Sequence, residues 1–253
     1  MKVLALNASP RKQGQSKTEL MLNNLVKGMR EAGADVEVIN LRDKQIENCK
    51  GCFFCWTKTP GICVQKDDMT NELYPKLLAS DLAIYGTPLY LSTVSASMKT
   101  FIDRTLPVLE PFFEKDNERI FHPYRHDRLK IVFLSVAAVP GDSVFDRLSS
   151  WANYLYAHSG KLVAEIYRSC SPALNLPLYQ EKSQDILAAV TQAGHELVKS
   201  ETILPDTMAR IKQPIMDDDS FIELSNHIWE ACIKNKMTIN EYIEKKLMAD
   251  SGV

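Results

Sequence analysis

Four of the six cysteines in this 253-residue chain lie close together, with the spacing of a metal or redox centre. Cys49-x-x-Cys52-x-x-Cys55 is followed after seven residues by Cys63. Four thiolates at such spacing can surround an iron–sulfur cluster, since bacterial ferredoxins use a related close run of cysteines. A Cys₄ zinc site is an alternative, although its two CxxC pairs are usually set further apart. A set of thiols without any metal is the other alternative.

A second group of polar residues follows the amino-terminal apolar run Val3–Leu6, which suits a buried parallel strand. A helical pattern begins after it, with its apolar residues on one face. The first N–H groups of a helix have no intrahelical partner, and the helix dipole favours an anion there. The loop between them therefore predicts a phosphate site, unless Ser16 is only a helix cap and Arg11 is solvated. Charge-assisted hydrogen bonds would come from Ser9, Arg11, Ser16 and Thr18.

Strands and helices then alternate as far as about residue 200. This alternation predicts a parallel sheet with helices on both faces, and five strands suit the flavodoxin-like doubly wound α/β order 2-1-3-4-5. In that order a ligand lies outside the carboxyl ends of the first and third strands, here the Ser9–Ser16 and Pro88–Val94 loops. Residues 110–128 are expected to form an irregular, charged connection. The further strands are expected at 35–41, 82–86, 129–136 and 162–167, and the further helices at 67–80, 96–106, 143–158 and 181–199.

The composition is that of an ordinary globular protein, with 45% hydrophobic and 25% charged residues and a net charge of -2. Nothing in it indicates a partner among nucleic acids or membranes, and no run is long enough to span a bilayer. The expected location is the cytoplasm. Residues 1–200 form the expected domain, and residues 201–253 a helical extension that packs on this domain or on a second subunit.

Three stretches together resemble the NADPH-dependent FMN reductase superfamily, and more closely its iron–sulfur flavoprotein branch. The first resembles S-P-R-x-x-G-N-[ST], with Gln15 in place of the usual Asn. The second is a P-x-Y turn ahead of a K-x-F-x-D-R helix, and the third is the cysteine motif ahead of Asp-Asp-Met. The matching residues are Ser9, Pro10, Arg11, Gly14 and Ser16; Pro88, Leu89, Tyr90, Lys99, Phe101, Asp103 and Arg104; and Cys49, Cys52, Cys55, Cys63, Asp67, Asp68 and Met69.

The resemblance implies FMN as cofactor and assigns it three sets of residues. One holds the phosphate, one lines the isoalloxazine and ribityl chain, and one forms a third wall. The motif residues Lys99, Phe101, Asp103 and Arg104 are expected to be structural and to position their own helix. The three sets are Ser9, Arg11, Gln15 and Ser16; Pro88, Leu89, Tyr90 and Thr93; and Ser135, Ala137, Ala138 and Val139.

The implied activity is that of an FMN-dependent oxidoreductase that passes electrons between a [4Fe–4S] cluster and FMN. The donor would be NAD(P)H or a ferredoxin-type protein, and the chain would form a homodimer or homotetramer. No catalytic side chain is assigned, because the flavin itself carries the hydride and electron chemistry. The alternatives are a cluster-free NAD(P)H-dependent FMN or quinone reductase, a non-catalytic FMN electron carrier, and a flavin-free redox sensor.

Overall fold

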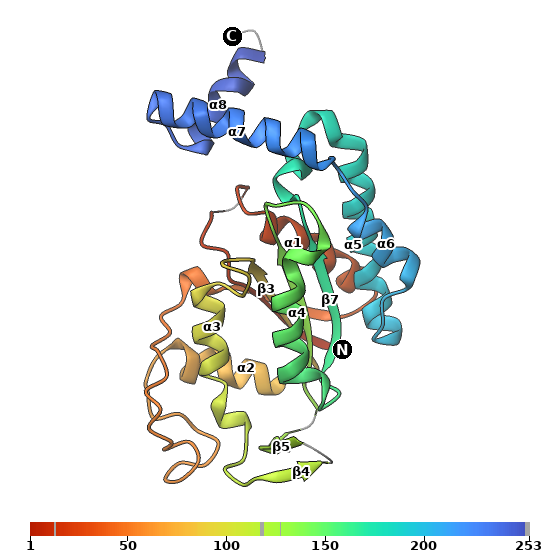
Figure 1. Cartoon of the computed structure of the whole chain (residues 1–253). Helices are drawn as coiled ribbons and strands as arrows, with labels where there is room; N and C mark the ends of the chain where they lie inside the picture. The colour runs from red at the N-terminus through yellow and green to blue at the C-terminus, as the bar shows by residue number, and fades with distance from the viewer. Residues whose placement is uncertain (13, 117–118, 127, 251–253) are drawn as a thin grey trace. The chain divides into compact units, whose positions relative to one another are not determined.

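The computed structural model describes residues 1–12, 14–116, 119–126 and 128–250, and the chain divides into two compact units, Met1–Gln213 and Pro214–Val253. The first unit is a layered α/β domain (Figure 1). Its strands are β1 (Lys2–Asn7), β2 (Asp35–Asn40), β3 (Leu82–Pro88), β4 (Glu114–Asp116), β5 (Arg119–Phe121), β6 (Lys130–Val136) and β7 (Leu162–Arg168). Its helices are α1 (Lys17–Glu31), α2 (Tyr74–Ala79), α3 (Ala96–Asp103), α4 (Asp146–Ala152), α5 (Gln180–Ser200) and α6 (Pro205–Lys212).

A five-stranded sheet with the order β2-β1-β3-β6-β7 forms the centre of this unit. Every neighbouring pair of its strands is parallel. Counted along these five strands alone, the order is 2-1-3-4-5, so the predicted flavodoxin-like fold is confirmed. The inner strands are continuous apolar runs because helices cover both faces of the sheet, and every residue of β3 is buried.

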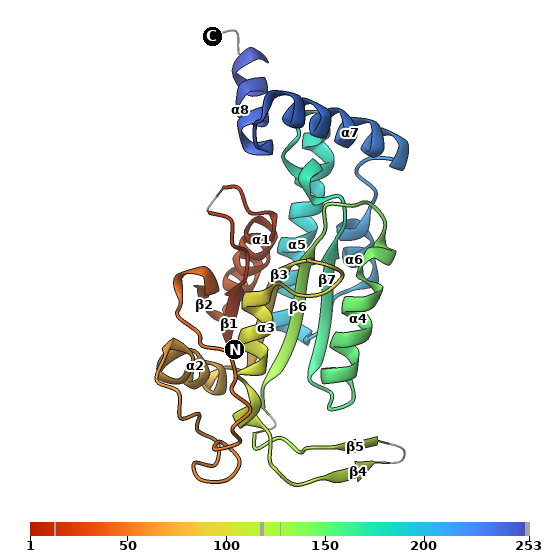
Figure 2. The same ribbon diagram turned by 60° about the vertical axis from the view of Figure 1, so that its left-hand side comes forward.

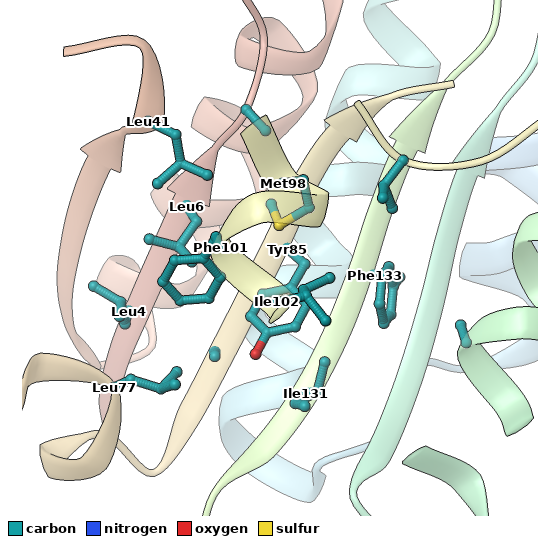
Figure 3. Close-up of a cluster of buried hydrophobic side chains, with 14 of the residues drawn as sticks. Leu4, Leu6, Leu41, Leu77, Tyr85, Met98, Phe101, Ile102, Ile131 and Phe133 are labelled. Carbon is teal, nitrogen blue, oxygen red and sulfur yellow. The ribbon is translucent and has the colours of Figure 1, made fainter. Parts of the chain in front are cut away.

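Successive side chains of each strand point to opposite faces of the sheet, so each face has its own core. On one face, Leu6 of β1 and Tyr85 of β3 pack beneath α3, where Phe101 is fully buried (Figure 3). On the other face α1 and α5 cross at very short range. A Cβ at Gly28 would lie 1.8 Å from the carbonyl oxygen of Thr191, so only glycine permits this crossing.

The first unit extends to Gln213 rather than to the expected boundary at 200, because α6 packs on it. Pro205 stands at the start of α6, where the missing N–H of proline has no partner to lose. The buried Arg168 donates to the carbonyl oxygens of Ile211 (3.0 Å) and Gln213 (2.7 Å). These bonds hold the end of α6 against β7.

Two other segments also differ from the expectation. The irregular connection expected at 110–128 contains the antiparallel hairpin β4–β5, whose strands are too short to produce a visible alternation in the sequence. The helix expected at 143–158 contains α4, preceded by a 3-10 turn (Asp142–Phe145) and followed by a π-helical turn (Asn153–Ala157).

The second unit lies within the expected helical extension, and its described residues form α7 (Asp218–Asn235) and α8 (Ile239–Asp250). Asp217 caps α7, since its carboxylate accepts the N–H of Ser220 at 2.9 Å. Thr238 and Glu241 accept each other's backbone N–H groups, which is a capping box at the start of α8. The surface on which this unit packs stays a prediction. Among the described helices, none has the length and apolar character that a membrane crossing requires.

Candidate functional site

The predicted phosphate loop lies between β1 and α1, and Arg42 holds its backbone. The Arg42 guanidinium donates to the carbonyl oxygens of Arg11 (3.0 Å) and Ser9 (3.5 Å). Ser16 is the N-cap of α1, and its hydroxyl accepts the N–H of Glu19 at 3.0 Å. The capping role of Ser16 is therefore established, while its contact with a phosphate stays a prediction. The role of Arg42 was not visible in the sequence, because it depends on the fold bringing β1 and β2 together.

Two cations meet at the N-terminus of α1. Arg11 is exposed, and Lys17, the first residue of the helix, is half-buried. Burial and the positive charge of Arg11 lower the pKa of Lys17 to about 8. An anion would relieve this repulsion and would complement the helix dipole, so this end of α1 fits the phosphate of FMN. The spacing of residues in the sequence did not single out Lys17, because spacing does not show which basic side chain lies near Arg11.

The loop after β3, predicted to line the flavin, contains a tight reverse turn. Tyr90 and Thr93 exchange both backbone hydrogen bonds, at 2.9 and 3.1 Å. Between them, Leu91 and Ser92 have φ angles of 46° and 66°. This left-handed conformation costs about 1–2 kcal/mol per residue for side chains other than glycine. Backbone strain of this kind clusters at ligand-binding sites, so the turn fits a wall of the flavin site.

The third predicted wall lies at the carboxyl end of β6 and begins with Ser135, which is fully buried. The Ser135 hydroxyl has no hydrogen-bond partner among the described residues. A bound ligand is one way to satisfy such a group. Ala137 is buried, whereas Ala138 and Val139 are exposed. Backbone hydrogen bonds of 2.9 Å at Ala137 and 3.0 Å at Val139 tie this loop to the end of β7 and the residues just after it.

The predicted phosphate loop and the turn at Tyr90–Thr93 are joined through Ala8. Its carbonyl oxygen accepts hydrogen bonds from the hydroxyls of Ser95 (3.1 Å) and Ser97 (3.2 Å). Its N–H donates to the carbonyl of Gly86 at 2.7 Å. Because Ser95 is also the N-cap of α3, both loops are fixed at the amino end of that helix.

A hollow of about 470 Å³ lies elsewhere on the domain, between α4 and β7. Its walls include Asp142, Asp146 and Glu165, and none of the predicted flavin residues lines it. The flavin assignment therefore rests on the three converging loops rather than on a cavity.

The cysteine segment is a loop whose two ends are tied together by Asp67 and Asp68. The Asp68 carboxylate accepts the N–H of Gln45 at 2.7 Å. The Asp67 carboxylate accepts the N–H of Glu47 at 2.9 Å, on the other side of the cysteines, and the N–H of Thr70 at 3.2 Å. The Asp-Asp-Met stretch thus closes the loop at its base.

Arg104, at the carboxyl end of α3, binds the same base, and its side chain is only 1% exposed. Its guanidinium makes two hydrogen bonds to Asp67 (2.5 and 3.0 Å), one to the Glu47 carbonyl (2.6 Å) and one to the Thr70 hydroxyl (3.1 Å). It also donates to the sulfur of Cys63 at 3.5 Å. Arg104 was expected to position only its own helix, but it binds the cysteine segment as well. The sequence could not show this contact, because Arg104 and the cysteine segment are far apart along the chain.

Burial of Asp67 opposes its ionisation. Hydrogen bonds from Arg104 and from the N–H groups of Glu47 and Thr70 outweigh this cost, and the pKa of Asp67 lies below its ordinary value. The carboxylate is therefore ionised at neutral pH and pairs with a guanidinium that does not lose its proton.

Leu106, Phe113 and His122 lie on the outside of the cysteine segment. The indole of Trp56 donates to the carbonyl of Leu106 at 3.2 Å, and its ring lies 4.6 Å from that of His122. The ring of Phe113 lies 4.3 Å from the same histidine. Figure 2 shows the hairpin β4–β5 at the same end of the first unit as this segment. The described residues of the segment 110–128, called the insertion below, therefore brace the cysteine segment.

The four predicted metal ligands differ in exposure: Cys49 and Cys52 are exposed, Cys63 is half-buried and Cys55 is buried. Burial raises the pKa of Cys55, and negative charge on the other three thiols raises it further, so all four lie within electrostatic range. Their ligation of a metal stays a prediction. Within the described ranges, no three His, Cys, Asp or Glu side chains are grouped to hold one metal ion.

This arrangement bears on the kind of group that the four cysteines could hold. Zinc needs sulfurs about 2.3 Å from a single ion. A cubane lies between its four sulfurs and keeps them further apart. Both groups take four thiolates, so the all-thiol donor set suits an iron–sulfur cluster as well as a Cys₄ zinc site.

Helix α3 separates the two candidate centres. Its amino end, capped by Ser95, holds the flavin loops, and its carboxyl end, at Arg104, holds the cysteine segment. Eight helical residues span about 12 Å at 1.5 Å per residue. The two centres are thus on one rigid element but at opposite ends of it.

A doubly wound sheet with polar loops gathered at its carboxyl edge is typical of nucleotide- and flavin-binding proteins. Comparison with known families is more specific, because residues 1–126 match NADPH-dependent FMN reductase. The N-terminal part of the chain belongs to this family.

Several curated relatives are named iron-sulfur flavoproteins. One from Archaeoglobus fulgidus is 42% identical over 107 residues, which are 42% of this chain and 46% of the relative. One from Methanocaldococcus jannaschii is 38% identical over 109 residues, which are 43% of this chain and 52% of the relative. The chain thus spans about half the length of the curated relatives it matches.

Solved structures share the fold at low sequence identity. An NAD(P)H:quinone oxidoreductase from Methanothermobacter marburgensis has a TM-score of 0.59 at 19% identity, covering 78% of this chain and 96% of that one. An FMN-dependent NADH-azoreductase from Bacillus anthracis has a TM-score of 0.57 at 13% identity, covering 78% and 99%. At such identities the likeness establishes the fold alone.

Proposed function

We propose that this protein is an FMN-dependent oxidoreductase in which Cys49, Cys52, Cys55 and Cys63 hold a [4Fe–4S] cluster that exchanges electrons with the flavin. One observation carries the proposal: two loops suited to FMN and a four-cysteine loop are fixed to opposite ends of α3. The names of the curated relatives support it. The electron donor in this proposal is NAD(P)H or a ferredoxin-type protein, and the working form is a homodimer or homotetramer.

Bound FMN would supply both hydride and single-electron chemistry. The residues of this chain bind and orient it. Arg11 and Lys17 attract the phosphate at the start of α1, the turn at Tyr90–Thr93 lines one side of the ring system, and Ser135 offers a hydroxyl at the end of β6. No side chain need donate or remove a proton for electrons to reach the flavin.

A second candidate is a cluster-free NAD(P)H-dependent FMN or quinone reductase. It is favoured by the exposure of two of the four thiols, those of Cys49 and Cys52. In this case the cysteines would remain thiols.

The deciding experiment is an optical spectrum of full-length protein purified without oxygen, with iron and acid-labile sulfide measured on the same sample. Flavin bands with about four irons per chain would support the first candidate. Flavin bands without iron would support the second. Cys52→Ala should lose the iron and keep the flavin, whereas Cys232→Ala, outside the cysteine segment, should keep both. Absence of flavin after gentle purification would contradict both candidates.

A further inference from the structure

Three buried hydrogen-bond donors around the cysteine segment have no partner among the described residues. They are the hydroxyl of Tyr74 and the Nε–H groups of Arg104 and Arg125. A buried donor without a partner costs about 1–3 kcal/mol, so such groups are rare in folded proteins. Three of them around one short loop indicate that an acceptor belongs there.

The three donors approach the loop from three different elements. Tyr74 begins α2, and its buried hydroxyl lies near the Cys55 thiol and the Arg125 guanidinium. Arg104 ends α3 and touches the sulfur of Cys63 at 3.5 Å. Arg125 belongs to the insertion, and its Cδ lies 3.6 Å from the position that a Cβ at Gly61 would take.

The charge of these groups indicates the kind of acceptor. Both arginines are cationic side chains. The ion pairs that they make with Asp67 and Glu110 leave their Nε–H groups unused. Cations and hydroxyl donors together suit an anionic group with several acceptor atoms. Thiolates with inorganic sulfide are such a group.

We propose that Tyr74, Arg104 and Arg125 are positioning residues for the cysteine centre, and that their hydrogen bonds and positive charge set its reduction potential. The inference rests on the cluster of the proposed function. A reduced cluster carries one more negative charge than an oxidised one, and hydrogen bonds to the sulfurs stabilise that charge. The three donors therefore raise the potential at which the cluster accepts an electron.

The test is an anaerobic redox titration of the full-length protein as purified, with iron and FMN content measured on the same sample. Arg104→Gln and Arg125→Gln each remove a cation, and Tyr74→Phe removes only a hydroxyl. Each arginine variant should shift the one-electron equilibrium at least tenfold against reduction, which is about 59 mV toward lower potential. Tyr74→Phe should shift it less, in the same direction. FMN content should not change, because the flavin loops lie at the other end of α3.

Matched controls come from the same chain. Lys99→Gln removes a cation from α3 that is half-exposed and paired with Asp103, and Tyr154→Phe removes an exposed hydroxyl. Both should keep the wild-type potential. Arg104→Lys keeps the charge but lacks the planar group that reaches several partners. Compared with Arg104→Gln, it should therefore restore part of the wild-type reduction potential, and a smaller part of any iron that Arg104→Gln loses.

Wild-type potentials in all three donor variants would overturn the inference and leave the iron–sulfur proposal intact. A shift in Lys99→Gln equal to that in Arg104→Gln would also overturn it, because the effect would then be one of general charge. If Arg104→Gln loses its iron, the reduction potential of Tyr74→Phe decides whether the inference holds, since this variant keeps the aromatic ring and its packing. A wild-type protein without iron would overturn the proposed function, and the role of these donors with it.

Discussion

The ion pair between Asp67 and Arg104 is the contact whose loss should weaken the first unit most clearly. The two side chains are only 5% and 1% exposed, and the carboxylate accepts two guanidinium bonds and two backbone N–H groups. Asp67→Asn preserves the shape of the side chain but leaves the Arg104 cation buried without its counter-charge. Removing one member of a buried pair costs about 3–5 kcal/mol, because the remaining charge cannot be solvated.

The effect should depend on pH in a defined direction. The pKa of Asp67 is lowered in the folded protein, so its ionised form stabilises the fold. That stabilisation is complete above the ordinary carboxyl pKa of about 3.9 and is lost as the pH falls through the lower, folded value. The difference between wild type and Asp67→Asn should therefore be full at neutral pH and shrink in strong acid.

The measurement is thermal and urea unfolding of both proteins, freed of flavin and metal so that ligand binding does not contribute. For a unit of this size about 1 kcal/mol corresponds to about 2–4 °C, so the melting temperature should fall by about 6–20 °C. Asp103→Asn is the control, because its pair with Lys99 is half-exposed and should contribute less than about 1 kcal/mol. Equal losses in the two variants would refute the argument that burial makes the Asp67 pair important.

Three further predictions concern the flavin site. Arg11→Ala should weaken FMN binding about 10- to 100-fold, as expected for the loss of about 1.5–3 kcal/mol in hydrogen bonds to a charged group; an unchanged Kd in a fluorescence titration would remove Arg11 from the phosphate site. FMN affinity should fall as the pH rises through about 8, because Lys17 then loses its charge in the flavin-free protein. In Lys17→Met this pH dependence should disappear, and its persistence would assign it to another group. Ser92→Gly should raise the free energy of unfolding by about 1 kcal/mol, because glycine adopts a positive φ without strain; a lower melting temperature would contradict this account of the turn.

The sequence by itself was sufficient for the sheet and its strand order, and it singled out the segments in which the candidate site is proposed. Three apolar runs require helices on both faces of the sheet to bury them, and they form β1, β3 and β6. These runs are Val3–Leu6, residues 82–86 and residues 129–136. The cysteine spacing and the loop before α1 are also local patterns. Such features are visible in one dimension because the periods of strands and helices act within a few residues.

Only the tertiary structure brought Tyr74, Arg104 and Arg125 to the cysteine segment, and only it joined the two flavin loops through Ala8. In the sequence, Arg104 is one residue of an ordinary amphipathic helix with an exposed ion pair nearby. Its partners Glu47, Asp67 and Cys63 lie dozens of residues away. Contacts at such separation depend on how the layers pack and on which buried charges must be paired, and neither is encoded in local spacing.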